Sequence, residues 1–149
     1  MTRHLLIISC SNNKDHQKRL MPAIQRYTGA SYGVINKLKR EGSFPTNLDV
    51  LIISAKYGLI LSDELIEDYD RKMDISRARE LNEPAVKKLK EILQKTDYES
   101  ILINLGREYM ETIRGFEEVV APSQKIFILK GKIGSRKREL RNWLISIFC

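Results

Sequence analysis

Four short runs of apolar and often β-branched residues alternate along the chain with segments whose apolar residues recur at helical spacing. The apolar runs cover residues 5–9, 50–54, 100–105 and 125–129. The helical segments cover residues 30–40, 76–94, 108–119 and 137–147, with a break expected near Pro84. Strands that alternate with helices predict βαβ units, a parallel sheet and right-handed crossovers. We therefore expect an α/β fold: a single three-layer domain over residues 1–149 with a mostly parallel central sheet of about four strands.

The charge of the chain favours an anionic partner. The formal net charge is +7 over 149 residues, and such an excess bears on association and solubility, not on the fold. The segment after Pro122 holds seven basic residues against one acid, Glu139. Residues 63–74 are predominantly acidic. We expect nucleic acid or a nucleotide as the partner.

The two cysteines, Cys10 and Cys149, form neither a disulfide framework nor a zinc-binding pattern, which favours a reducing cytoplasm and no metal site. The first apolar run is too short to span a membrane, and no signal-peptide cleavage site follows it. We expect a cytoplasmic protein without membrane contact. The sequence indicates neither a particular cofactor nor an oligomeric state.

Polar and reactive side chains follow the first two apolar runs. Residues 9–14 read Ser-Cys-Ser-Asn-Asn-Lys, and residues 54–58 read Ser-Ala-Lys-Tyr-Gly. Because ligands of open α/β sheets bind at the carboxyl ends of strands, we expect a site at this edge. Cys10 is a candidate nucleophile if Lys14, His16 or a helix N-terminus activates its thiol. The alternative is a buried cysteine that packs as a small hydrophobic residue.

The neighbouring residues are candidates for binding. Hydroxyls, amides and backbone donors of Ser9, Ser11, Asn12 and Asn13 are suited to a phosphate or a nucleobase. Lys56 is a candidate for phosphate pairing or proton donation, and Tyr57 for base stacking. The alternative is a plain strand exit with a tight turn at Gly58.

Later segments add three groups of candidates. Asn104 and Gly106 end the third run, and Tyr109 follows as a candidate for base stacking. The loop before the last helix offers phosphate-binding groups or, alternatively, a solvated basic turn. Its candidates are Lys130, Lys132, Ser135, Arg136, Lys137 and Arg138. Asp68 and Asp70 are candidate acid–base groups if their loop folds back, and otherwise belong to a solvated loop.

Two motifs, in order, resemble a family of small bacterial, archaeal and phage domains of unknown function. They are Cys10-Ser11-Asn12-Asn13-Lys14 with Tyr27-Thr28-Gly29, and Ser54-Ala55-Lys56-Tyr57-Gly58-Leu59 followed by Asp63-Glu64-Leu65-Ile66-Glu67-Asp68-Tyr69-Asp70. Together they cover most of residues 5–73. The motifs are more distantly similar to the YaaA peroxide-stress proteins.

The spacing of Cys10 and Lys14 also resembles the C-x-x-x-K-P-Y element of archaeosine synthase, an enzyme of 7-deazaguanine modification in transfer RNA. Asp15-His16 replaces the Pro-Tyr pair of that element. The corresponding domain of that enzyme resembles uracil-DNA glycosylases. The resemblance therefore implies a uracil-DNA-glycosylase-like fold, with residues 131–138 placed where such folds hold a phosphate backbone.

These observations predict an enzyme that processes a nucleobase or nucleoside in nucleic acid or nucleotides, by base modification or N-glycosidic chemistry. The predicted catalytic residues are Cys10, Lys14, Lys56, Asp68 and Asp70. The predicted substrate-binding residues are Ser9, Ser11, Asn12, Asn13, Tyr27, Ser54, Tyr57, Gly58, Asn104 and Gly106. A non-catalytic nucleic-acid-binding protein that protects against stress is the alternative, and a small-ligand sensor is a third possibility.

Overall fold

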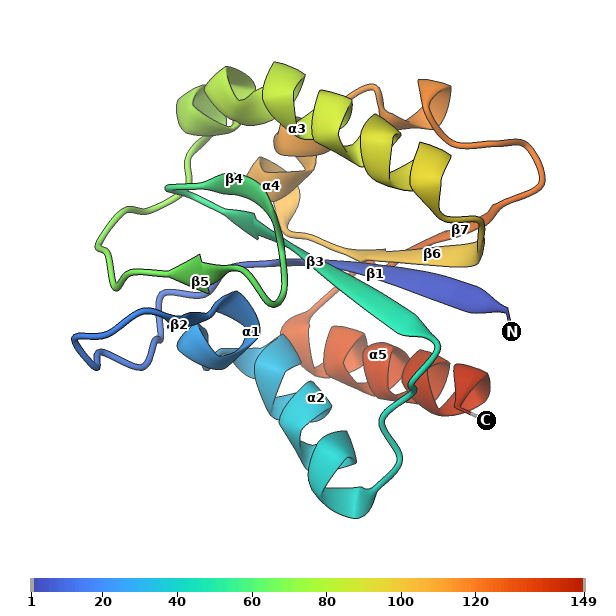
Figure 1. The fold of residues 1–149 in the computed structure, drawn as a ribbon, viewed down its shortest axis with the longest axis horizontal. Coiled ribbons are helices and arrows are strands. Elements are labelled where there is room, and N and C mark those ends of the chain that lie inside the picture. The colour runs from blue at the N-terminus through green and yellow to red at the C-terminus, as the bar shows by residue number, and fades with distance from the viewer. Residues whose placement is uncertain (1, 149) are drawn as a thin grey trace.

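The structure is a computed structural model that describes residues 2–148, and its centre is a five-stranded sheet of order β4-β3-β1-β6-β7 (Figure 1). The strands are β1 (Arg3–Ser9), β3 (Leu48–Ser54), β4 (Gly58–Leu61), β6 (Tyr98–Asn104) and β7 (Lys125–Ile128). Strands β1, β3, β6 and β7 run parallel, and β4 pairs antiparallel with β3. The α/β class and the mostly parallel sheet are confirmed, with five strands in place of about four. Cys149 lies outside the described residues.

Helices cover both faces of the sheet. Helices α2 (Ala30–Glu41) and α5 (Ile133–Ile147) lie on one face, and α3 (Ile75–Lys95) lies on the other (Figure 1). Alternate side chains of β1 enter the two cores: Leu6 and Ile8 pack on the side of α2 and α5, while Leu5 and Ile7 pack on the side of α3. Burial on both faces explains why β1, β3 and β6 read as continuous apolar runs.

The register brings the carboxyl ends of β1 and β3 together. Ser9 lies opposite Ile53, and the Cys10 N–H donates to the Ile53 carbonyl at 2.8 Å. Strand β6 flanks β1 on the other side, where Ile8 lies opposite Asn104. The loops that follow these three strands therefore share one edge of the sheet.

The predicted break near Pro84 is wrong, because α3 runs unbroken through this residue. Pro84 is exposed, so the carbonyl that loses its helical hydrogen bond faces water. The helix therefore tolerates the proline without a break.

Two other helical predictions differ from the structure, one in continuity and one in its start. Residues 108–119 form a short helix α4 (Arg107–Met110) and two 3₁₀ turns, η1 (Glu111–Ile113) and η2 (Phe116–Glu118), instead of one helix. The segment is divided at Gly115, which has a left-handed backbone with φ of 92°. Helix α5 begins at Ile133, ahead of the predicted start at residue 137.

A small layer beside the main sheet was not predicted. It contains β2 (Met21–Pro22), β5 (Leu65–Ile66) and the single-turn helix α1 (Ala23–Arg26), with β2 and β5 paired antiparallel. Its elements are too short to carry a periodic pattern. Between residues 2 and 148, no helix is both long and apolar enough to cross a membrane.

Candidate functional site

A pocket of about 200 Å³ lies at the carboxyl edge of the sheet, beside Cys10. Four segments form it: the loop after β1, the N-terminus of α2, the end of β6 and the N-terminus of α5. Seven of the residues predicted for the site line this pocket: Ser9, Cys10, Ser11, Asn104, Gly106, Arg136 and Lys137. Residues that are distant in sequence are therefore brought together as the strand-end argument predicts.

Cys10 is 8% exposed and lies at the wall of the pocket. Its Sγ lies 3.2 Å from the Oη of Tyr109, which α4 presents. Burial, together with the neighbouring thiol, raises the pKa of Tyr109 well above its ordinary value. Tyr109 therefore remains a neutral phenol and can donate a hydrogen bond to the sulfur atom.

Two helix N-termini face the pocket without side-chain caps. Helix α2 begins after Gly29 and α5 after Lys132, and neither capping residue provides a side-chain hydrogen bond. The first N–H groups of a helix lack intrahelical acceptors and carry the positive end of the helix dipole. The lining of the pocket is thus suited to a negatively charged group.

The loop after β1 is fastened to the start of α2 through Gly29. The Gly29 N–H donates to Ser11 Oγ at 3.1 Å, and Ser11 Oγ donates to the Asn13 carbonyl at 2.6 Å. A Cβ atom on Gly29 would lie only 2.6 Å from Ser11 Cβ. Glycine is therefore needed here for close approach, which gives a physical reason for the Tyr27-Thr28-Gly29 motif.

Arg136 and Asn104 join three elements of the pocket. The guanidinium of Arg136 donates to the Leu105 carbonyl at 3.0 Å and to Asn104 Oδ1 at 3.4 Å, and its Nε donates to the Gly131 carbonyl at 3.0 Å. Asn104 Nδ2 donates to Ser31 Oγ at 3.0 Å. Arg136, which the sequence marks as a phosphate-binding residue, is thus also a structural tie between β6 and α5.

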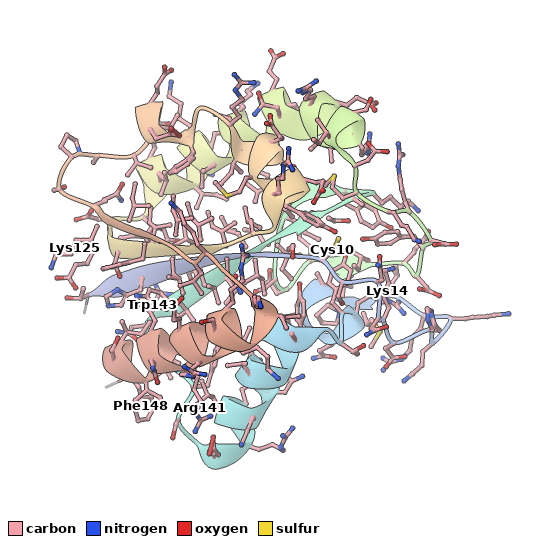
Figure 2. All side chains as sticks on the ribbon, turned by 180° about the vertical axis from the view of Figure 1, so that it is seen from behind. Cys10, Lys14, Lys125, Arg141, Trp143 and Phe148 are labelled. Carbon is pink, nitrogen blue, oxygen red and sulfur yellow. The ribbon has the colours of Figure 1, made fainter. Side chains whose placement is uncertain are left out.

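A second group of predicted residues gathers next to the pocket, around Tyr69; we call it the tyrosine–lysine cluster. It contains Lys14, Tyr27, Ser54, Lys56, Tyr57 and Tyr69. Lys14 Nζ lies 4.6 Å from the centre of the Tyr69 ring, and Lys56 Nζ lies 6.0 Å from it. Cys10 and Lys14 lie at the same end of the molecule, opposite Lys125 (Figure 2).

Buried hydroxyls hold Tyr69 in place. Its Oη lies 2.7 Å from Tyr27 Oη and 2.9 Å from Ser54 Oγ. Burial raises the pKa of Tyr27 to about 12 and that of Tyr69 further still. Both phenols are therefore neutral near pH 7. Ser54 Oγ also accepts the N–H groups of Lys56 and Tyr57, which fixes the turn between β3 and β4.

Sequence reasoning did not single out Tyr69 or Arg26, although Tyr69 lies inside one of the two motifs. Arg26 is fully buried, and its guanidinium donates to the carbonyls of Asp15, Gln17, Arg19 and Ile66. It therefore ties the loop that carries Lys14 to β5, which precedes Tyr69. A four-residue helix with a buried arginine gives no periodic pattern by which it could have been recognised.

The remaining predicted residues lie outside the pocket lining. Asp68 is exposed and bonds to His16 at 3.0 Å, and this hydrogen bond lowers the pKa of the carboxyl. Asp70 is exposed. Gly58 starts β4 with φ of 77° and serves the turn. Of the other predicted residues, Asn12 and Asn13 in the loop after β1, Lys130 and Lys132 before α5, and Ser135 and Arg138 within α5 are exposed. Among residues 2–148, no three His, Cys, Asp or Glu side chains gather as metal ligands.

Comparison with known proteins gives a family and a fold. A family model described as "Family of unknown function (DUF6884)" matches residues 5–142. The solved structure described as "Crystal structure of AF0587, a protein of unknown function" is similar with a TM-score of 0.54 at 11% identity. The match covers 96% of the present chain but only 44% of that chain, so the chain spans less than half of its length. No curated protein matches. At this identity the structural likeness concerns the fold alone.

Proposed function

The chain belongs to the DUF6884 family of unknown function, and we propose that it is an enzyme that processes a nucleobase or nucleoside within nucleic acid or a nucleotide. The observation that carries the proposal is the position of Cys10. Its thiol lies in the wall of a pocket that two uncapped helix N-termini and Lys137 make electropositive. A reactive group beside an anion-binding surface suits a phosphorylated substrate with a reacting base.

The dimensions of the pocket favour a partly enclosed substrate. Ligand pockets usually measure about 300–1,000 Å³, and this one measures about 200 Å³. It accommodates one part of a nucleotide, while the rest extends over neighbouring groups. The adjoining tyrosine–lysine cluster provides ammonium groups and aromatic rings for that remainder.

The placement of the predicted catalytic groups favours chemistry centred on Cys10. Tyr109 is positioned to donate a hydrogen bond to the reacting centre beside the sulfur atom. Lys14 and Lys56 lie beside the pocket, around Tyr69. Asp68 and Asp70 lie outside the pocket lining. Base modification is therefore the favoured reaction, with N-glycosidic cleavage as the second possibility.

The resemblance to archaeosine synthase supports the same choice. It rests on Cys10 and Lys14, and both residues lie at the candidate site. A uracil-DNA-glycosylase-like variant of the α/β fold belongs to this proposal, as does a cytoplasmic location for a protein with a free buried thiol. Fold likeness alone does not assign an activity.

The proposal is tested by nucleoside-resolved mass spectrometry of DNA and transfer RNA incubated with the purified protein. We expect a released or altered base with the wild-type protein, and none with Cys10→Ala. Ser123→Ala is the control, because Ser123 is exposed and far from the pocket lining. Circular dichroism checks that both variants fold. An unchanged nucleoside profile with wild-type protein, or full activity of Cys10→Ala, contradicts the proposal.

A non-catalytic nucleic-acid-binding protein is the second candidate, and the similarity to YaaA peroxide-stress proteins agrees with it. The observation that favours it is the basic surface around α5. Lys130, Lys132, Lys137 and Arg138 are exposed, and none forms an ion pair within the described part of the chain. In that case Lys137→Gln combined with Arg138→Gln weakens polymer binding and lowers its salt dependence, while Cys10→Ala changes nothing.

A further inference from the structure

Cationic side chains lie on both sides of Cys10 along the edge of the sheet. Cys10 follows β1, the central strand, and Lys56 follows β3 on one side. On the other side, β6 and then β7 follow β1 in the sheet, and the chain continues from β7 into α5, which carries Lys137. The pocket beside Cys10 is therefore flanked by positive charge in two directions.

On the β3 side, two lysines meet at one aromatic ring. Lys14 and Lys56 both lie within cation–π distance of Tyr69, and neither forms an ion pair among residues 2–148. Two ammonium groups that lie beside one ring and have no carboxylate partner attract an anion, because the ring compensates only part of each charge. This is a position for one phosphate.

On the α5 side, the available charge is that of Lys137. It lines the pocket, is exposed and lacks an ion pair within residues 2–148. Arg136 lies next to it, and its Nε and Nη1 already donate to backbone carbonyls and to Asn104. Lys137 therefore makes the direct contact and Arg136 adds charge from behind. This is a position for a second phosphate.

Two phosphate positions on either side of one base pocket match an internal nucleotide of a chain. Neighbouring strands lie about 4.8 Å apart, so the ends of β3 and β6 are separated by about 10 Å across β1. A free mononucleotide has one phosphate group and fills only one position. A base inside a duplex cannot reach a recessed thiol without leaving the stack. Tyr57, whose ring is partly exposed beside Lys56, adds a surface for stacking the next base.

We infer that the substrate is an internal nucleotide of single-stranded nucleic acid, with its two flanking phosphates held by Lys14 and Lys56 on one side and by Lys137 on the other. The inference rests on the proposed function for the identity of the reacting group. It goes further because it excludes free nucleotides and intact duplexes as preferred substrates. It also assigns Lys14 and Lys56 to binding.

The test is a length series measured by competition against a fluorescent oligonucleotide at several salt concentrations. The competitors are 5′-phosphorylated mono-, di-, tetra- and octanucleotides of mixed sequence, as DNA and as RNA, with the octanucleotide also as a duplex. We expect affinity to rise at least tenfold from mono- to tetranucleotide, and the single strand to bind more tightly than the duplex. Lys56→Gln and Lys137→Gln each weaken tetranucleotide binding and lower the salt slope by about 0.7.

Lys90→Gln is the matched control. Lys90 is exposed on α3 and does not line the pocket, so this substitution removes the same charge at a distance from the site. The inference is overturned if the mononucleotide binds as tightly as the tetranucleotide, if the duplex binds as tightly as the single strand, or if either site variant behaves like the control. Cys10-dependent chemistry on free nucleotides would retain the proposed function and remove this inference. Length-dependent binding without any altered base would retain this inference about binding and remove the proposed function.

Discussion

At the scale of single residues, Gly29 is where one added methyl group is expected to disturb the site. Its φ of −72° suits any residue, so only the 2.6 Å approach of an added Cβ to Ser11 decides the effect. We expect Gly29→Ala to displace the loop after β1, to destabilise the protein by about 1–3 kcal/mol and to weaken oligonucleotide binding. Urea denaturation and the binding assay above measure both effects.

Gly33 provides the comparison, since it lies in α2 just after Gly29 and no atom lies within 4 Å of an added Cβ. Gly33→Ala is expected to stabilise the protein by up to about 1 kcal/mol through helix propensity and to leave binding unchanged. Equal behaviour of the two variants would show that the contact with Ser11 has no part in shaping the site.

The buried phenols make the stability of the protein sensitive to alkali. Burial raises the pKa of Tyr27 from 10.0 to about 12, so the folded state holds a proton that the unfolded chain releases above pH 10. The contribution of Tyr27 to the free energy of unfolding is therefore complete below pH 10. It falls by about 2 kcal/mol as the pH rises toward 12. Urea unfolding at pH 8 to 11 checks the trend.

Tyr27→Phe separates titration from packing. The variant lacks the hydrogen bond to Tyr69, which costs about 1 kcal/mol at pH 8, but it has no proton to lose. Its stability should fall less steeply with pH than that of the wild type. Parallel curves for the two proteins would mean that Tyr27 ionises as easily when folded as when unfolded.

How far the site could be predicted depends on the residue. Ser9, Cys10 and Ser11 were identified because the end of a buried parallel strand is a local property of the sequence. Tyr69 and Ser31 were not, because their positions depend on the contacts of Tyr69 with Tyr27 and of Ser31 with Asn104. Such contacts join segments more than 40 residues apart, and no spacing rule describes them.

At the scale of elements, Arg26 holds the small layer beside the sheet in place. Its buried guanidinium serves the carbonyls of one loop, residues 15–19, and of Ile66 in β5. Arg26→Met would leave these acceptors without their donor; the bond to the Ile66 carbonyl is buried and the other three are part-buried. We expect a loss of about 2–4 kcal/mol, since an unpartnered buried acceptor costs about 1–3 kcal/mol and water satisfies part of the other three.

Hydrogen exchange locates this effect. The amides of Asp15 and Thr28, which are bonded to the Arg26 and Asn13 carbonyls, should exchange faster in Arg26→Met, and those in the centre of β1 much less so. Arg26→Lys keeps the charge but cannot reach four carbonyls. Its exchange rates at Asp15 and Thr28 should lie between those of the wild type and of Arg26→Met. Uniform exchange across the whole chain would contradict a local role for Arg26.

The elements that could be predicted are those with a long periodic pattern. Strands β1, β3 and β6 and helix α2 were identified because their apolar residues repeat over five or more positions. Helix α3 was wrongly divided because the exposure of Pro84 follows from how the helix packs, which a sequence does not state. Strand β4 was missed because its four residues gain their pairing only from β3.

At the scale of the whole molecule, the two ends of the sheet have different roles. The carboxyl end holds the pocket, while the amino end holds a polar network in which Asp49 accepts from Arg3 at 2.5 Å and from Tyr98 at 2.6 Å. Groups of this kind at the opposite end of the sheet act on the free energy of folding. Stability and binding should therefore be separable by mutation.

Asp49→Asn tests this separation. The amide keeps the shape but loses the charge that Arg3 pairs with, and because both side chains are about one-third exposed the expected loss is only about 1 kcal/mol. Oligonucleotide affinity should remain unchanged within about 0.5 kcal/mol, and the stability effects of Asp49→Asn and Gly29→Ala should add within the same margin. A loss of affinity in Asp49→Asn, or a clear departure from additivity, would mean that the sheet transmits changes between its ends. The geometry of the pocket would then depend on the whole sheet and not on the loops that line it.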